Sequence, residues 1–364
     1  MPFKKLTYRS IQKVSIHNLT EIPENNQQQQ ESDSSREEIP AGTRVDRYIV
    51  VELIGEGGYG DIYEVKDSET GNKYAMKIEY LDAEKRGLQL ETKILKSIQS
   101  SNLFPSFIAS GTSENFKYIV MELMGPSLSL LRREMPDGKL SKFSLLSFSA
   151  HMIRCIRKLH KFGYIHRDIK PGNFLIRPNR NSPLCLIDFG LSRRYIDKKT
   201  GLHKPPREDA GYTGTVRYAS LHAHDETELS RRDDLISWFY SLLELNESKC
   251  PWPGSVNKEL TIKMKREMTT EQLCQNLPKE FLQIINHIYA LEYADEPDYD
   301  LILKLIDQAI KNEHFKEKKY DFEYLSDDEI HEISSISLKM EEPQEELYAS
   351  KVDQSDTGYC CTIC

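Results

Sequence analysis

Two short segments that lie close together in the sequence constrain the fold of this chain more than any other feature. Residues 166–173 read His-Arg-Asp-Ile-Lys-Pro-Gly-Asn, and residues 184–190 read Leu-Cys-Leu-Ile-Asp-Phe-Gly. The second segment is an apolar strand that delivers an acidic residue at its end. A carboxylate, a lysine, an amide oxygen and a second carboxylate therefore arrive together on two adjoining loops.

These four side chains are the groups that phosphoryl transfer requires. Asp168 would accept the proton of an acceptor hydroxyl and aim its oxygen, and Lys170 would neutralise charge growing on the γ-phosphoryl group of ATP. Asn173 and Asp188 would ligate Mg²⁺. Both patterns occur in order behind a glycine-rich turn and a strand lysine, so a purely structural origin is a poor explanation.

The glycine-rich turn has the form G-x-G-x-x-G. Without a Cβ, a glycine backbone approaches anionic oxygens closely and presents its amide groups to them. A dinucleotide site would need a helix directly after the glycines, but the residues that follow, Asp61–Val65, are typical of a strand. A hairpin over phosphates is favoured, with four glycines as candidates: Gly55, Gly57, Gly58 and Gly60.

A lysine and a glutamate complete the phosphate-binding pattern. Lys77 ends the strand Lys-Tyr-Ala-Met-Lys, in the pattern V-A-I-K, where a fixed cation binds the α- and β-phosphates. Glu91 lies on the one long helical pattern before Glu122 and would hold Lys77 in an ion pair. Taken singly, Lys77 fits a surface lysine equally well, and Glu91 fits a solvated helix face.

The secondary-structure pattern changes along the chain and predicts an α+β fold. Before Glu122 the apolar segments are short and rich in β-branched and aromatic residues, with one helical pattern at residues 83–97. After Gly125 the apolar residues recur at helical spacing. The predicted strands lie at 48–55, 61–65, 73–80 and 116–123, and the helices near 148–160, 235–245 and 281–291.

Both ends have the composition of unfolded segments. Residues 25–38 contain no apolar side chain, and residues 321–364 hold twelve acidic residues against two lysines. The net charge of −8 therefore comes from the tail, and the first 320 residues are nearly neutral. We predict an arm at 1–46, a domain at 47–320 with lobes at about 47–122 and 126–320, and a tail at 321–364.

The same composition excludes several classes of protein. A nearly neutral body with an acidic tail is a poor partner for nucleic acid. No stretch has the roughly 18–20 apolar residues of a spanning helix, and the first residues lack the apolar run of a secretory signal. Four scattered cysteines suit reduced thiols, so we expect a cytoplasmic protein, with the nucleus also open: Cys155, Cys185, Cys250 and Cys274.

Over residues 47–315 the chain resembles the eukaryotic protein kinases, which implies a two-lobed fold with a small antiparallel β-sheet lobe and a larger, mainly helical lobe. Gly214–Ser220 (GTVRYAS), Ser230–Leu235 (SRRDDL) and Val120–Leu128 (VMELMGPSL) are similar to the casein kinase I group. Pro205–Tyr212 (PPREDAGY) is most similar to its tau-tubulin kinase branch. The A-P-E that usually ends the activation segment is absent.

The resemblance assigns roles to further residues. It implies that Met121 is the gatekeeper and that Glu122 and Leu123 form the hinge that binds adenine. It also implies that Thr215 ties the activation segment to the catalytic loop, which Asp234 anchors from a buried helix. The group's usual S-I-N reads Ser-Leu-His at 220–222, which puts the packing role of the asparagine in question. The residues expected to sandwich the adenine base are Ile54, Ile62, Ala75 and Leu175.

The resemblance also bears on the substrate. A lysine at position 170 is the pattern of kinases that act on Ser and Thr hydroxyls. Six basic residues between Ser192 and Asp209 would favour acidic or already phosphorylated substrates. Arg207 aligns with the anion-binding arginine of the group and is predicted to bind an acidic or phosphorylated residue upstream of the target. A solvated basic loop is the alternative interpretation.

The tail carries two further hypotheses. Its Ser326-Asp-Asp-Glu segment fits the acidic substrate pattern, so the tail would dock as a pseudosubstrate, or it is an inert solvating segment. Lipidation of Cys360, Cys361 and Cys364 would give peripheral membrane contact. No heptad run suggests an oligomer, and a monomer is expected.

The alternative function from another class is a catalytically inactive, kinase-fold scaffold tethered through its tails. Such scaffolds usually lack the strand lysine or one of the two acidic residues. In this chain Lys77, Asp168 and Asp188 are all present. The sequence therefore favours an active serine/threonine protein kinase.

Overall fold

The computed structural model describes residues 38–57, 60–83, 86–177, 183–335 and 348–349. Met1–Glu38 and Ile39–Cys364 are separate units, and every helix and strand of the described residues lies in the second. The first strand pair begins at Arg44, and Gly42 already donates a backbone hydrogen bond to Val50 at 2.8 Å. The folded unit thus begins before the predicted boundary at residue 47.

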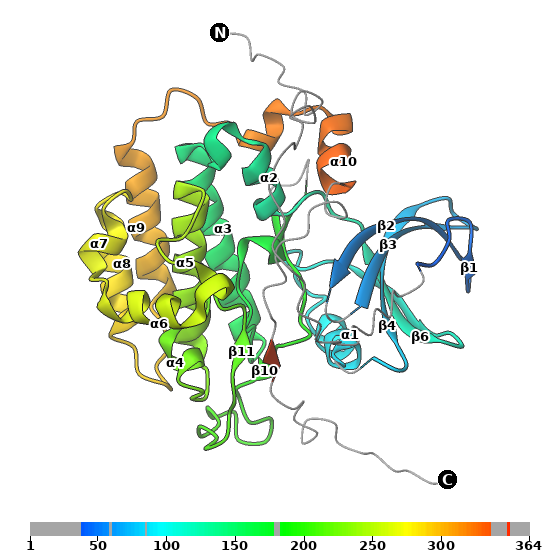
Figure 1. Ribbon diagram of the computed structural model, residues 1–364, viewed down its shortest axis with the longest axis horizontal. Coiled ribbons are helices and arrows are strands. Elements are labelled where there is room, and N and C mark those ends of the chain that lie inside the picture. The colour runs from blue at the N-terminus through cyan, green and yellow to red at the C-terminus, as the bar shows by residue number, and fades with distance from the viewer. Residues whose placement is uncertain (1–37, 58–59, 84–85, 178–182, 336–347, 350–364) are drawn as a thin grey trace, which may run out of the picture. The chain divides into compact units, whose positions relative to one another are not determined.

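A six-stranded antiparallel sheet makes up the N-terminal part of this unit (Figure 1). Tyr48, Tyr63 and Met76 are fully buried at the centre of its hydrophobic cluster. The strand order is β1-β2-β3-β4-β6-β5, with β1 at Arg44–Val45, β2 at Tyr48–Gly57, β3 at Gly60–Asp67, β4 at Lys73–Tyr80, β5 at Phe107–Thr112 and β6 at Phe116–Glu122. The sheet contains the four predicted strands and two short ones, β1 and β5, that were not predicted.

One helix, α1 (Leu88–Ser97), packs against this sheet. It begins five residues later than the pattern predicted, and the reason is a cap supplied from the sheet. The buried carboxylate of Glu79 accepts hydrogen bonds from the backbone N–H groups of Gly87 and Leu88, at 2.6 and 2.9 Å. These N–H groups have no partner within a helix, so an acidic side chain there fixes where the helix starts.

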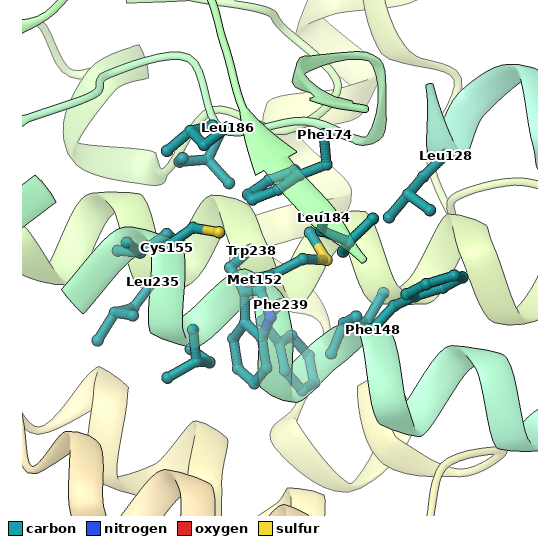
Figure 2. Packing of buried hydrophobic residues seen from close by; sticks show 14 of the residues in the cluster. Leu128, Phe148, Met152, Cys155, Phe174, Leu184, Leu186, Leu235, Trp238 and Phe239 are labelled. Carbon is teal, nitrogen blue, oxygen red and sulfur yellow. The ribbon is translucent and has the colours of Figure 1, made fainter. Parts of the chain in front are cut away.

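Helices form the remainder of the folded unit, and the three predicted ones are confirmed as α3, α5 and α8. Helix α3 packs against α5 and α9, and the indole Nε1 of Trp238 on α5 donates to the carbonyl of Ser149 on α3 at 3.2 Å. Figure 2 shows Phe148, Met152 and Trp238 packed together in this core. The helices are α2 (Leu128–Glu134), α3 (Lys142–Lys161), α4 (Leu221–His224), α5 (Arg231–Glu247), α6 (Lys258–Glu267), α7 (Thr270–Cys274), α8 (Glu280–Tyr289), α9 (Tyr299–Asn312) and α10 (Asp327–Ser335).

Three two-stranded sheets position the loops between α3 and α5. Strands β8 (Phe174–Ile176) and β9 (Leu184–Leu186) form an antiparallel pair that holds the two motif loops side by side. Strand β7 (Tyr164–Ile165) pairs with β10 (Arg193–Arg194), and β11 (Thr213–Gly214) pairs with β12 (Tyr348–Ala349). The last pair places a piece of the tail beside the segment that leads to Thr215.

The predicted tail is folded over its first fifteen residues. Asp321 accepts a hydrogen bond from the backbone N–H of Ser141 at 2.9 Å, and its own N–H donates to Ser144 Oγ at 2.9 Å. Phe322 is buried and stacks with Phe148 at a centroid distance of 6.3 Å. The boundary after residue 320 therefore cuts through the folded unit, because local acidity conceals contacts with α3 that lie about 180 residues away.

Helix α10 continues this folded segment. It packs against α2 and also against β2, so it touches both the helical part and the sheet. Ile333 is buried, and His331 Nε2 lies 3.9 Å from Glu52 Oε1 on β2. The predicted lipidation sites at Cys360, Cys361 and Cys364 lie outside the described residues.

Two further expectations concern the described part of the chain. None of its helices is long and apolar enough to cross a bilayer. Its four cysteines are free thiols in the interior, and burial raises the pKa of Cys155 to about 12. A buried thiol with a raised pKa is a poor nucleophile, so these cysteines serve the packing.

Candidate active site

The loop between β7 and β8 carries Asp168, and a buried carboxylate on α5 holds it in place. Asp234 accepts hydrogen bonds from the backbone N–H groups of His166 and Arg167, at 2.7 and 2.8 Å. The ring of His160 lies 2.8 Å from the same carboxylate. Burial opposes the charge of Asp234, but the bond with His160 and the neighbouring groups keep its pKa below the ordinary value. The loop is therefore anchored to a rigid helix.

Two non-glycine residues of the site have left-handed backbone conformations. Arg167 has φ of 69° and Asp188 has φ of 64°. Such conformations cost energy and persist only where the surroundings enforce them, often at functional sites. The space beside the loop is also tight: a Cβ on Gly214, whose φ is +110°, would lie 2.8 Å from the carbonyl oxygen of Arg167. Only glycine fits there.

The structure brings the predicted catalytic residues together around Asp168, which is 4% exposed. Thr215 Oγ1 donates to Asp168 Oδ1 at 2.7 Å, and Lys170 Nζ lies 2.9 Å from Oδ2. Lys170 also donates to Thr215 Oγ1 at 3.1 Å. Asn173 Nδ2 donates to the backbone carbonyl of Asp168 at 2.8 Å. The activation segment is thus joined to the catalytic loop through side chains of both.

The second motif loop meets the strand lysine. Lys77 Nζ lies 2.7 Å from Glu91 Oε2 and 2.9 Å from Asp188 Oδ1, and it is 7% exposed. Burial would lower the pKa of Lys77, but the carboxylates of Asp188 and Glu91 outweigh it and raise that pKa. Burial acts against Asp188 as well, yet Lys77 lowers its pKa to about 2. Lys77 is therefore a permanent cation beside the ionised Asp188, whereas burial raises the pKa of Glu91 despite the neighbouring Lys77.

The catalytic loop and the second motif loop are also joined directly. The ring Nε2 of His166 lies 2.9 Å from the carbonyl oxygen of Ile187, the residue before Asp188. Phe189 is buried beside this contact, with ring centroids 5.7 Å from His166 and 5.8 Å from Phe104. A displacement of one loop therefore moves the other.

The glycine turn is a tight hairpin in which Gly57 pairs with Gly60. Gly60 has φ of +126°, and a Cβ there would lie 1.8 Å from the carbonyl oxygen of Ile78, so no other residue fits. Gly55 lies on β2 in the same hairpin, and Gly58 lies outside the described residues. Strand β3, which follows the turn, pairs Ile62 with Lys77 on β4.

The predicted adenine-binding residues come from five strands, β2, β3, β4, β6 and β8, and from Leu123 directly after β6. Ala75 on β4 pairs directly with Met121 on β6, and both are buried. The partly buried side chains of Ile54, Ile62 and Leu123 pack against the same cluster. Leu175 lies on β8 and forms a bridge with Ser127.

One residue of the predicted hinge has a partner that sequence reasoning missed. Arg177 donates to both carboxylate oxygens of Glu122, at 2.9 and 2.8 Å, and also to the backbone carbonyls of Asn102 and Phe104. The bonds with Arg177 lower the pKa of Glu122 against the effect of burial. Arg177 follows β8 directly, and no motif marks it.

The predicted substrate-binding arginine is held by a carboxylate of the chain itself. Arg207 makes a bidentate contact with Glu228, which is 2% exposed, and Arg193 Nε lies 3.4 Å from the same residue. Burial lowers the pKa of the nearby Arg167 to about 10, and Arg193 adds to this effect. Arg207 therefore belongs to a cluster of arginines around one buried glutamate.

The structure answers the question raised by Ser-Leu-His at residues 220–222. His222 Nδ1 lies 2.8 Å from Asp233 Oδ1, and Ser220 Oγ donates to the same oxygen at 2.7 Å. Asp233 also accepts the N–H of Ser230 at 2.8 Å and so caps α5. His222 is therefore a partner of the carboxylate that caps α5.

Comparisons with known proteins place the chain in a family. Residues 48–316 match the family described as the protein kinase domain. A protein from Dictyostelium discoideum, named a probable serine/threonine-protein kinase, is 39% identical over 265 residues, which are 72% of this chain and 53% of that protein. The chain belongs to the protein kinase family, and the predicted two-lobed kinase fold is confirmed. It spans about half the length of this relative.

Proposed function

We propose that the chain is a serine/threonine protein kinase that transfers the γ-phosphoryl group of ATP to hydroxyl groups of proteins. This proposal rests on two neighbouring clusters of side chains, one around Lys77 and one around Asp168. Lys77 bridges Glu91 and Asp188, while Asp168 is held by Lys170 and Thr215. The Dictyostelium relative, named a probable serine/threonine-protein kinase, supports the same activity.

Each residue has a chemical task in this reaction. Asp168 accepts the proton of the acceptor hydroxyl, and its orientation is fixed by Thr215 and Lys170. The ammonium of Lys170 stabilises negative charge that grows on the transferred group. Lys77 holds the phosphates of ATP, and the glycine hairpin covers them with backbone N–H groups. The residues around Ala75 and Met121 take the adenine base.

The donor set fits a magnesium ion that is shared with the nucleotide. Asp188 and Asn173 offer a carboxylate and an amide oxygen on adjoining loops, and Mg²⁺ is usually held by one or two such groups plus substrate phosphates. The described residues contain no cluster of three or more His, Cys, Asp or Glu side chains that would form an all-protein cage. A bound Mg²⁺ neutralises phosphate charge in this chemistry.

Three finer assignments belong to the same proposal. The motifs GTVRYAS and PPREDAGY support the casein kinase I group and its tau-tubulin kinase branch. The arginines around Glu228, with Arg207 the most exposed part of the contact, support a preference for acidic or phosphorylated substrates. We further propose a cytoplasmic monomer that contacts membranes peripherally when its terminal cysteines are lipidated.

The test is phosphate transfer from labelled ATP with Mg²⁺ to casein and to matched peptides with and without an upstream phosphoserine. Asp168→Asn should abolish transfer, because it removes the proton acceptor while keeping the shape of the side chain. Asp300→Asn, at a carboxylate that is 78% exposed on α9, is the control and should be active. ATP binding without transfer by the intact chain would instead support the inactive scaffold.

A further inference from the structure

Helix α6 carries a lysine in an unusual environment. Lys265 is 5% exposed, and its Nζ donates to the backbone carbonyls of Val216 and Ala219, at 2.8 and 2.7 Å. The rings of Tyr240 and Trp252 lie beside the ammonium, with centroids 5.0 and 5.1 Å away. Carbonyl dipoles and aromatic faces thus stabilise a buried positive charge.

The two carbonyls belong to the segment that directly follows Thr215. The backbone N–H groups of Tyr218 and Ala219 both donate to the carbonyl of Thr215, at 3.0 and 2.9 Å. Trp252 Nε1 donates to the carbonyl of Arg217 at 2.8 Å. The segment therefore forms a tight turn whose carbonyls point to α6 and its neighbours. Thr215, which directly precedes this turn, bonds to the catalytic carboxylate.

A histidine, His224, lies beside the ammonium of Lys265. His224 Nε2 lies 3.3 Å from Lys265 Nζ, and burial together with the charge of Lys265 lowers the pKa of His224 to about 3. The imidazole is therefore neutral at physiological pH and accepts a hydrogen bond from the ammonium. The contact adds an uncharged acceptor to the two backbone carbonyls.

The position of this lysine bears on the absent A-P-E sequence. An acidic residue at the end of the activation segment would need a cation as its partner. In this chain a buried cation, Lys265, binds the main chain of the segment. The side chains of Arg217 and Tyr218 also contact Glu244 on α5, so Lys265 holds the backbone of a turn whose side chains α5 holds.

We propose that Lys265 is a positioning residue that fixes the turn from Val216 to Ala219, and with it the surface on which the acceptor residue rests beside Asp168. This inference rests on the proposed kinase function. Without the ammonium, two buried carbonyls lose their donor and the turn shifts. The acceptor then binds more weakly, whereas the ATP site, built by Lys77 and the glycine hairpin, keeps its geometry.

The experiment uses the full chain with Lys265→Met, Lys265→Arg and, as control, Lys263→Met, which changes an exposed lysine on the same helix. We expect Lys265→Met to raise KM for an acceptor peptide by about tenfold or more. Affinity for a fluorescent ATP analogue should stay within about twofold of the unsubstituted chain. Lys265→Arg should recover part of the loss, because a guanidinium also donates to carbonyls.

Several results would overturn the inference. A peptide KM unchanged in Lys265→Met, or a loss of maximal rate with no change in KM, would show that Lys265 only supports the fold. If Lys265→Met does not fold, Trp252→Phe removes the bond to the carbonyl of Arg217 and replaces the larger ring beside the ammonium with a smaller one, and an unchanged peptide KM in that variant would be equally negative. Absence of transfer by the unsubstituted chain would instead refute the proposed function.

Discussion

Substitution of Asp234 by Asn tests how the catalytic loop is held. The carboxylate accepts three hydrogen bonds, two at Oδ2 and one at Oδ1, in a site that is 2% exposed. Asparagine can place its oxygen at the Oδ2 position and keep the bonds from His160 and His166. Its amide group then faces the N–H of Arg167, so a donor opposes a donor.

The magnitude follows from these three bonds. A bond to a charged group contributes about 1.5–3 kcal/mol and a neutral bond about 1 kcal/mol. One charged bond is lost and two become neutral, so the free energy of unfolding should fall by about 2.5–7 kcal/mol. For the roughly 300 residues from Ile39 to Ser335, an unfolding entropy of about 0.6 kcal/mol/K converts this into a Tm lower by about 4–12 °C.

The assay is thermal unfolding followed by intrinsic fluorescence, with kinase activity measured well below the Tm. The control is Asp300→Asn, since Asp300 also receives two bonds from one partner, Arg157, at 2.7 and 2.8 Å. Its exposure predicts a cost of only about 0.2–1 kcal/mol, or less than about 2 °C. A Tm of Asp234→Asn within 2 °C of this control, with activity retained, would refute the reasoning.

Two further predictions concern pH and the tail. Burial lowers the pKa of His151 to about 4. Between this value and the ordinary pKa near 6.5, only the unfolded chain binds the proton, so the free energy of unfolding decreases as the pH is lowered. When the pH is lowered from 7.5 to 5.0, the free energy of unfolding measured in urea should fall by about 1–2 kcal/mol less for His151→Gln than for the unsubstituted chain. An equal decrease in the two proteins would contradict this. A chain ending at Ser335 keeps α10 but lacks β12, which pairs with Thr213–Gly214. The KM of this shortened chain for the peptide should fall about two- to fivefold, because the strand pairing that would compete with the peptide is worth roughly 0.5–1 kcal/mol after the cost of loop closure. An unchanged KM would argue against a tail that competes with substrate.

The parts of the site that sequence predicts well are those written in short contiguous motifs. Asp168, Lys170 and Asn173 share one loop, so their proximity follows from the chain itself. The helices were predictable where apolar residues recur at helical spacing, as on α8, whose buried residues include Phe281, Ile284, Ile285 and Ile288. Local pattern and tertiary packing agree in these places.

The parts that sequence missed depend on single residues and distant partners. Arg177 reaches Glu122 across 55 positions, and Lys265 reaches Val216 across 49. Neither lies in a motif, because one long side chain meeting a backbone carbonyl or a carboxylate leaves no pattern in the neighbouring residues. The acidic composition after residue 320 was misleading for the same reason, since Asp321 is stabilised by α3 and not by its neighbours.

The packing of Asp321 and Phe322 against the start of α3 has a consequence for synthesis. Asp234, which bonds to the catalytic loop, leaves the ribosome about 90 residues before this segment. At roughly 5–20 residues per second, the interval is about 5–20 s. During that time the nascent chain already contains the catalytic side chains. The contacts of Ser141, Ser144 and Phe148 with the final segment are still missing, so this surface of α3 is exposed. The sheet, with a hydrophobic cluster of its own, can mature earlier.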